Sequence, residues 1–188
     1  MARAFAPTTP EPETARPRAA AIVAAAGRIL ETEGRDALTM RRLGEAVGIR
    51  APSLYRHYPD KAAVEILLLE AGFEALADAF EAAFAREGES LDTLGRAFRA
   101  FCLARPHLYR LMTTGRLPRE RMRPDVEARA AAPLVRVAGG DEHIARAAWA
   151  FAHGMVILEL DDRFPPGADL DAAWKAGLDA FMARARTG

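Results

Sequence analysis

Apolar residues recur at intervals of three and four along most of the chain, which is the period of amphipathic α-helices. No segment alternates apolar and polar residues with the period of two that is typical of strands, and Ala, Leu, Glu and Arg dominate the composition. Glycine and proline interrupt the pattern and set the expected ends of the elements. We therefore expect an all-α protein of about nine helices. They span residues 17–33, 40–47, 52–58, 61–86, 90–104, 106–114, 122–138, 141–162 and 170–186.

The first three helices are expected to form a small N-terminal domain. The helix at 17–33 has an apolar stripe that consists of Ile22, Ala25, Ala26, Ile29 and Leu30. Thr39 suits the N-cap of the next helix, Gly48 tolerates the positive φ of a tight turn, and Pro52 suits a first helical position. The third helix should end at Tyr58, because the residue before a proline avoids the α region.

Two short helices joined by a glycine turn are unstable alone, so packing must hold them. The apolar residues available to dock them on the first helix are Leu43, Val47, Ile49 and Leu54. This arrangement is a helix-turn-helix, which places its second helix in the major groove of DNA.

Polar residues of this segment suit contacts with DNA. Arg50 precedes the second short helix, where its guanidinium could reach a guanine edge. Lys61 lies at the start of a long helix, whose dipole favours an anion. The candidate DNA-binding residues are Thr39, Arg50, Ala51, Ser53, Tyr55, His57 and Lys61. For Arg56 a solvated surface charge is the alternative, and Tyr58 is interpreted as a packing residue.

Three motifs and one further residue stand out in this segment: TMRRL at 39–43, EAVGI at 45–49, SLYRHY at 53–58 and Lys61. With this spacing the segment resembles the DNA-binding domain of the tetracycline-repressor (TetR) family of bacterial regulators. The resemblance implies that Tyr55 and Lys61 contact phosphates, and that Arg50, Ala51 and Ser53 lie near base edges. It also implies a homodimer that binds a palindromic double-stranded DNA operator and releases it when a small-molecule effector binds. Repression is the habit of the family; activation remains an alternative.

A second set of motifs lies in the C-terminal half. Residues 149–154 read W-x-x-x-H-G, and residues 105–112 read RPHLYRLM. Both resemble the regulatory domain of a TetR subgroup that is named for its Trp-His-Gly signature. Trp149 and His153 are four residues apart and share one helix face. They form either a wall that orients a ligand or a core tryptophan beside a satisfied histidine.

Aromatic and sulfur-bearing residues in this half suggest a pocket for a largely hydrophobic effector. The candidate lining residues are Leu68, Phe73, Phe98, Phe101, Tyr109, Met112, Trp149 and His153. Ordinary core packing is the alternative for each of them.

The helices at 141–162 and 170–186 are expected to form the dimer interface as a four-helix bundle with two-fold symmetry. The first offers Ala147, Ala150, Phe151, Gly154, Val156 and Leu158, and the second offers Leu170, Trp174, Leu178, Phe181 and Met182. The alternative is that these stripes only close the core of a single chain.

Charge and composition change this picture little. The chain has 188 residues and no net charge, but residues 1–61 hold ten Lys or Arg against seven Asp or Glu. A mildly basic N-terminal part on an acidic body is compatible with phosphate contacts at one end. The single cysteine excludes an intrachain disulfide, and no apolar run is long enough to cross a membrane, so we expect a cytoplasmic protein. The expected divisions are a flexible tail at 1–16, a DNA-binding domain at 17–60 and a sensing and dimerisation domain at 61–188.

Two other classes of protein compete with this interpretation. An enzyme would need a nucleophile elbow, a metal-ligand spacing or a phosphate loop, and none of these motifs occurs, so neither catalysis nor a cofactor or metal is expected. Cys102 lies among apolar residues and is interpreted as a buried side chain. A helical ligand-binding module that has lost its operator is the second alternative, and the intact Thr39, Tyr55 and Lys61 argue against it.

Overall fold

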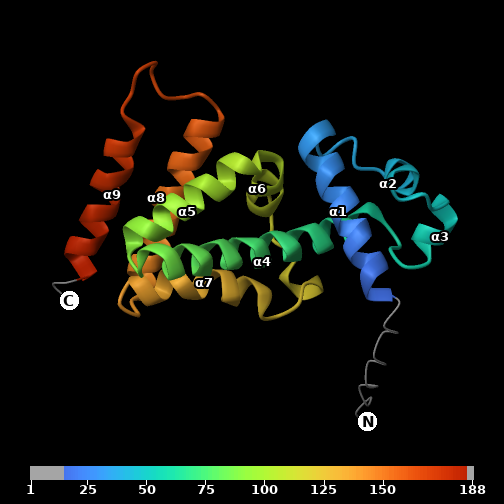
Figure 1. Ribbon diagram of the computed structural model, residues 1–188, viewed down its shortest axis with the longest axis horizontal. Coiled ribbons are helices and arrows are strands. Elements are labelled where there is room, and N and C mark those ends of the chain that lie inside the picture. The colour runs from blue at the N-terminus through green and yellow to red at the C-terminus, as the bar shows by residue number, and fades with distance from the viewer. Residues whose placement is uncertain (1–14, 186–188) are drawn as a thin grey trace, which may run out of the picture. The chain divides into compact units, whose positions relative to one another are not determined.

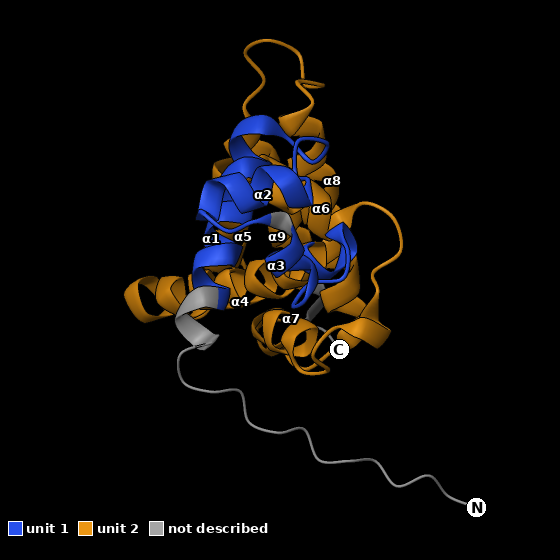
Figure 2. Ribbon diagram, turned by 90° about the vertical axis from the view of Figure 1, so that its right-hand side faces the viewer, with its two compact units in different colours: residues 1–64 blue, residues 65–188 orange. Residues whose placement is uncertain are grey.

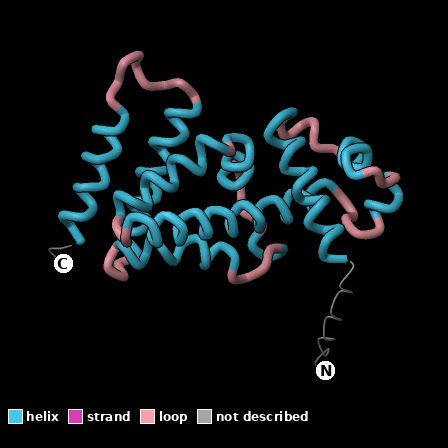
Figure 3. The backbone as a smooth tube through the Cα atoms, viewed as in Figure 1, coloured by secondary structure: helices cyan, strands magenta, loops and turns pink. Residues whose placement is uncertain are grey.

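The computed structural model describes residues 15–185, within which there are nine α-helices, one short 3-10 helix and no strand (Figures 1 and 3). The all-α prediction is therefore confirmed. The helices are α1 (Ala15–Glu33), α2 (Met40–Val47), α3 (Ala51–Tyr55), α4 (Lys61–Glu87), α5 (Leu91–Ala104), α6 (Pro106–Thr113), α7 (Val126–Val137), α8 (Glu142–Leu160) and α9 (Leu170–Ala185), with the 3-10 helix η1 (Arg119–Arg121) before α7.

The chain divides into two compact units, residues 1–64 and residues 65–188, which Figure 2 colours separately. The division falls in the first turns of α4, so this helix contributes residues to both units. Of the tail expected at 1–16, residues 1–14 lie outside the described part of the chain, and the last two residues belong to α1.

The first unit is held together by the apolar stripe of α1, on which α2 packs. All five residues of that stripe are buried, as are Leu43 of α2 and Leu54 of α3. Val47 and Ile49, which were expected to share this role, are only half-buried. Burial of such side chains stabilises each of these short helices far more than their intrinsic helix propensity does.

Local hydrogen bonds set the ends of the two short helices. Thr39 caps α2, because its side-chain oxygen accepts a hydrogen bond from the backbone N–H of Arg42 at 3.1 Å. Gly48 ends α2 in the left-handed region, at φ 67° and ψ 28°. The third helix ends at Tyr55 rather than at Tyr58 as expected, and the carbonyl of Leu54 accepts hydrogen bonds from the backbone N–H groups of both His57 and Tyr58. The chain thus turns out of α3 before Pro59.

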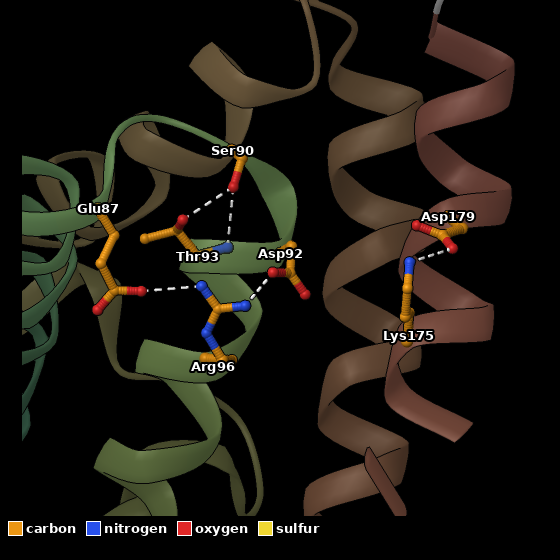
Figure 4. Close-up of polar contacts among 7 residues, drawn as sticks. All are labelled: Glu87, Ser90, Asp92, Thr93, Arg96, Lys175 and Asp179. Carbon is orange, nitrogen blue, oxygen red and sulfur yellow. Dashed lines mark hydrogen bonds and ion pairs between the residues drawn. The ribbon is translucent and has the colours of Figure 1, made fainter. Parts of the chain in front are cut away.

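Helix α5 lies at the centre of the second unit and packs against α6, α7, α8 and α9. Its buried face includes Leu91, Leu94, Phe98, Phe101 and Cys102. The helix begins with a Ser90 cap, whose side-chain oxygen accepts a hydrogen bond from the backbone N–H of Thr93 at 3.0 Å (Figure 4). Nearby, the guanidinium of Arg96 joins Asp92 of α5 to Glu87 at the end of α4. On α9, Lys175 and Asp179 form a separate ion pair at 2.7 Å.

Helix α7 begins at Val126, four residues later than the start expected at 122. Pro124 disfavours the α conformation at Arg123, and the backbone N–H of Arg123 donates instead to the carboxylate of Glu70 at 2.7 Å. The expected helix also contains Pro133, and here the structure agrees with the expectation, because α7 continues through this buried proline.

Ion pairs join the acidic side of α4 to α7 and to the segment before it. Arg123 binds Glu70 and Glu74, Arg129 binds Asp78, and Arg136 binds Glu81 and Glu89, all at 2.5–3.2 Å. The glutamates at 70, 74 and 81 and Asp78 are spaced by three and four, so they lie along one side of α4. Each exposed pair contributes little alone, and together they join α7 and the segment before it to one side of α4.

Candidate nucleic-acid interface and ligand cavity

The candidate DNA-binding residues lie mostly on the surface of the first unit. The side chains of Thr39, Arg50 and His57 are exposed, and Tyr55 is 51% exposed although it is a large aromatic residue. Ser53 and Lys61 are half-buried, and the side chain of Ala51 is outside the described set. An exposed tyrosine with an accessible hydroxyl, beside an arginine, is suited to contacts with a phosphate and a base edge.

Some of these residues also hold the unit together. The ammonium group of Lys61 donates a hydrogen bond of 2.6 Å to the carbonyl of Arg35, which fastens the start of α4 to the loop before α2. The hydroxyl of Ser53 accepts one from Arg56 at 3.1 Å and so orients that guanidinium on the outer side of α3. An ammonium has three N–H groups and a guanidinium has five, so neither of these two hydrogen bonds uses every donor of its group.

Two arginines of α2 have structural partners. Arg42 binds Glu33 of α1 through two nitrogens, at 2.6 and 3.0 Å, and this hydrogen bonding lowers the pKa of the Glu33 carboxyl. Arg41 pairs with Glu45 one turn further along α2, at 2.8 Å. Among the described residues no carboxylate pairs with Arg50, which lies in the extended residue before α3. The placement of Arg50 thus differs from that of both α2 arginines.

The second unit contains a cavity of about 700 Å³. Side chains of α4 to α9 and of the segment after α6 line it. Six of the residues expected in a pocket lie on its wall, namely Phe73, Phe98, Tyr109, Met112, Trp149 and His153. Leu68 and Phe101 do not line it, and both are buried elsewhere. Phe98, one turn before Phe101 on α5, lines the cavity instead, and the sequence pattern does not distinguish the two kinds of buried position.

A hydrogen-bonded pair of polar side chains lies in the mostly apolar wall, which also includes Thr113, whose hydroxyl donates to the carbonyl of Tyr109 at 2.8 Å. The hydroxyl of Tyr109 and Nδ1 of His153 are 2.7 Å apart, and the ring of Phe98 meets Tyr109 edge-on at 5.6 Å between centroids. Trp149 stacks on His153, with an interplanar angle of 22° and centroids 5.6 Å apart. Burial raises the pKa of Tyr109 and lowers that of His153, so both groups favour their uncharged forms.

Charged residues at the edge of the cavity were not expected from the sequence. They are Arg116, Arg119, Glu127, Glu142 and Arg146. Two ion pairs join four of them, Arg119 with Glu127 at 2.6 Å and Arg146 with Glu142 at 2.5 Å. Sequence reasoning missed these residues because exposed charged residues are common, and only the folded chain brings them to one cavity.

The apolar residues of α8 and α9 form two sets, one buried within the unit and one exposed. Val156, Trp174 and Leu178 are buried within the unit. Phe151 packs against Gly177, where an added Cβ would lie 2.1 Å from the phenyl ring. On another side of α8 a different set is uncovered: Ala147, Ala150 and Leu158 are exposed, and an added Cβ at Gly154 would meet nothing within 4 Å.

Neither a metal-binding cluster nor a membrane-spanning helix occurs among the described residues. No group of three His, Cys, Asp or Glu side chains among them could hold a metal ion. None of their helices is long and apolar enough to cross a membrane. Cys102 is fully buried, and burial raises the pKa of its thiol, so the reactive thiolate form is disfavoured.

A helix-turn-helix with Arg50, Tyr55 and His57 exposed at its second helix is typical of DNA-binding proteins. Residues 22–65 match the family model described as "Bacterial regulatory proteins, tetR family". Residues 91–181 match the model described as "Tetracyclin repressor-like, C-terminal domain". The chain belongs to the TetR family and is a DNA-binding transcriptional regulator. The matched descriptions do not name the Trp-His-Gly subgroup, and membership of that subgroup stays a prediction.

Solved structures with the same fold cover nearly the whole chain. The protein SCO4313 has a TM-score of 0.75 at 25% identity, over 93% of this chain and 100% of that one. A protein of unknown function from Rhodococcus sp. RHA1 has a TM-score of 0.75 at 24% identity, over 88% and 94%. A TetR variant from Acinetobacter baumannii AYE, in complex with minocycline, has a TM-score of 0.61 at 26% identity, over 89% and 97%. A comparison with curated protein sequences found no match.

Proposed function

We propose that the protein is a cytoplasmic repressor that binds a palindromic operator as a homodimer and is released from it by a small, largely hydrophobic effector. The observation that carries the proposal is the exposure of Arg50, Tyr55 and His57 at the second helix of a helix-turn-helix, where exposed side chains can reach the bases and phosphates of DNA. The helix α3 would lie in the major groove, with Arg50 at a base edge and Tyr55 and Lys61 at phosphates.

The proposed dimer uses α8 and α9. Ala147, Ala150 and Gly154 recur at three and four residues on α8. Both alanines are exposed, and a Cβ added at Gly154 would meet nothing within 4 Å among the described residues. On α9, Ala173, Ala176 and Ala180 are exposed with the same spacing. Small residues allow helices of two subunits to approach closely. A two-fold dimer would place its two helix-turn-helix domains, here called the reading heads, on half-sites about 34–36 Å apart.

The proposed effector site is the cavity of the second unit. Its volume is within the range of pockets for small molecules. The related TetR variant from Acinetobacter baumannii, whose structure was determined with minocycline, supports a ligand-binding role. Phe73, Leu76 and Phe80 of α4 line the cavity, and the same helix begins in the first unit. A ligand that prefers one position of α4 would therefore change the spacing of the two reading heads.

The dimer is tested by light scattering on the purified protein, whose chain mass is 20.4 kDa. We expect twice that mass for the wild type and for Ala82→Glu, and a monomer for Ala150→Glu. Both alanines are exposed on helices and both have an arginine four residues away, so the two substitutions differ only in the surface they alter. A monomeric wild type, or a dimer that persists in Ala150→Glu, would contradict the proposed interface.

The operator is tested by band shift with the DNA upstream of the gene. A palindrome there should bind on the order of 100-fold more tightly than one half-site, because the second reading head then binds intramolecularly. Ala150→Glu should lose this advantage and Ala82→Glu should keep it. Equal affinity for the palindrome and the half-site would exclude operator binding by a dimer.

A further inference from the structure

We infer that the cavity takes an uncharged, mostly apolar molecule with a carbonyl oxygen, and that the Nε2–H group of His153 donates a hydrogen bond to that oxygen. The inference rests on the proposed role of the cavity as the effector site and names the chemistry of its ligand. Its basis is the juxtaposition of Tyr109 and His153 in a mostly apolar wall, in which the hydroxyl of Thr113 already donates to the carbonyl of Tyr109, and the ion pairs that occupy the charged groups at the edge.

The contact with Tyr109 determines which nitrogen of His153 carries the proton. Burial raises the pKa of Tyr109, so its hydroxyl keeps its proton, and burial lowers the pKa of His153, so its ring is neutral. Tyr109 as a residue is 1% exposed, and among the described residues the one side-chain partner of its hydroxyl is Nδ1 of His153. A buried O–H without an acceptor is unfavourable, so Tyr109 donates to Nδ1. The imidazole proton is then on Nε2.

The Nε2–H group is the donor that remains for a ligand. No described residue accepts a hydrogen bond from it, whereas His153 lines the cavity and is half-buried. Trp149 stacks on one face of the imidazole and Tyr109 holds its Nδ1 edge, so the orientation of the ring is restricted. A neutral donor in a restricted orientation matches a carbonyl oxygen, which offers two lone pairs and needs no counter-charge.

The charged residues at the edge disfavour an ion inside. Glu127 and Glu142 are each bound by an arginine, so a cation would find no unpaired carboxylate. The side chains of Arg116, Arg119 and Arg146 are 83%, 67% and 67% exposed and pair with glutamates. Guanidinium groups in contact with water attract an anion weakly, and an ion in the apolar interior would lose hydration without compensation. The wall that remains is aliphatic and aromatic, with Leu94, Phe98, Met112 and Leu134 among its residues.

Four naphthalenes of similar size test this inference: 2-acetylnaphthalene, 2-isopropylnaphthalene, 2-naphthoate and 2-naphthylmethylamine. Their affinities are measured at pH 7.5 by displacement of the neutral dye N-phenyl-1-naphthylamine. The ketone should bind about fivefold more tightly than the isopropyl compound, as one hydrogen bond from a neutral donor provides, and more tightly than either ion. His153→Phe should abolish the preference for the ketone, whereas His143→Phe, an exposed position on the same helix, should keep it.

Two further measurements test the inference even if His153→Phe does not fold. The double variant Tyr109→Phe/His153→Phe removes both partners of the hydrogen bond, which costs less stability than removing one, and it should also lack the preference. The ¹⁵N chemical shifts of the His153 ring in the wild type should show a protonated Nε2 and an unprotonated Nδ1. The reverse tautomer, equal affinity for the ketone and the isopropyl compound, or tighter binding of either ion would overturn the inference.

These outcomes separate the inference from the proposed function. If all four naphthalenes bind without a preference for the ketone, the cavity is a ligand site and only the assignment of its chemistry is wrong. If the dye and all four compounds fail to bind, the effector site itself is refuted along with the inference. Operator binding is measured independently by the band shift and is unaffected by either result.

Discussion

The two units of the chain assemble their functional surfaces over very different distances along the sequence. In the first unit every candidate DNA-binding residue lies between Thr39 and Lys61, and the contacts that orient Thr39 and Ser53 span three residues. In the second unit the cavity is lined by residues from Phe73 to Leu178, and its polar pair joins residues 44 positions apart. The first surface is a short and mostly exposed segment, although Lys61 also binds the carbonyl of Arg35, 26 residues away. The second surface depends on the packing of six helices.

Electrostatic contacts show the same contrast. Arg42 in the first unit binds Glu33, nine residues away, and both side chains are more than a third exposed. Arg99 in the second unit binds Glu159, 60 residues away, and these side chains are 23% and 16% exposed. Arg99 also binds Asp171, so it joins α5 to both α8 and the start of α9. Substitutions of the exposed DNA-binding residues in the first unit should therefore alter DNA binding with little change in stability. Substitutions that remove long-range contacts in the second unit should alter stability.

The largest expected effect is that of Gly177→Ala in the second unit. The new Cβ would lie 2.1 Å from the ring of Phe151, which is itself held by Trp174 and Phe181. Overpacking of this kind should lower the free energy of unfolding by about 3 kcal/mol in urea denaturation. Gly72→Ala is the control, because its Cβ would meet the flexible thioether of Met112 at 2.7 Å. It should change stability by less than about 1 kcal/mol, since alanine favours the helix. Equal losses would show that the ring of Phe151 moves as readily as Met112.

The next effect concerns the long-range ion pair of Arg99. Arg99→Met keeps an apolar stem but leaves the largely buried carboxylate of Glu159 without its bidentate partner. We expect a loss of about 2 kcal/mol in the free energy of unfolding. In the first unit, Arg41→Met removes a highly exposed pair with Glu45 and should cost less than about 0.5 kcal/mol. A comparable cost for both variants would contradict the contrast between local and long-range contacts.

A smaller effect, confined to DNA binding, is expected for Arg50→Ala. It should reduce affinity about tenfold at operators with the preferred base at one position and relax the preference there. The unfolding midpoint should stay the same, since Arg50 is exposed. Arg41→Ala serves as the matched arginine control. The measurement is a band shift with operators varied base by base, and a uniform loss on every operator would show that Arg50 does not read a base.

The smallest effect is the pH dependence that His153 contributes to stability. Burial lowers its pKa in the folded state, so the unfolded state takes up a proton first as the pH falls. The stability that the neutral ring contributes is fully present above about pH 6.5, the unfolded pKa, and is lost as the pH falls below it. Thermal melts at pH 7.5 and pH 5.5 should therefore differ less for His153→Phe than for the wild type or His143→Phe. An unchanged difference would show that burial does not perturb His153.

The same contrast explains how far the sequence predicts the structure. The apolar period predicted the helices well, and capping residues such as Thr39 and Gly48 act over three or four residues, so their positions can be inferred locally. The predicted ends of helices were wrong where tertiary contacts intervene. Arg123 turns to Glu70 on α4 and delays α7, and the chain leaves α3 after Tyr55.

The cavity could be predicted only in part. Phe98 and Phe101 are both buried residues of α5, yet only Phe98 lines the cavity. A three-residue spacing does not say which neighbouring helix each side chain faces. The pairing of Tyr109 with His153 joins α6 to α8, and no local pattern predicts it. The role of the candidate DNA-binding residues stays a prediction, because their exposure permits contact with DNA but does not identify the bases.

The most direct test of the reading head is the affinity for the DNA upstream of the gene, measured by fluorescence anisotropy over a range of salt concentrations in the presence of competitor DNA. We predict saturable binding that weakens steeply with salt, a slope about one unit smaller for Lys61→Gln, and uniformly weaker binding for Tyr55→Phe. Glutamine removes the positive charge and keeps an amide N–H donor for the carbonyl of Arg35, on a side chain one atom shorter. Weak binding that is equal on any DNA and unaffected by either substitution would contradict the account.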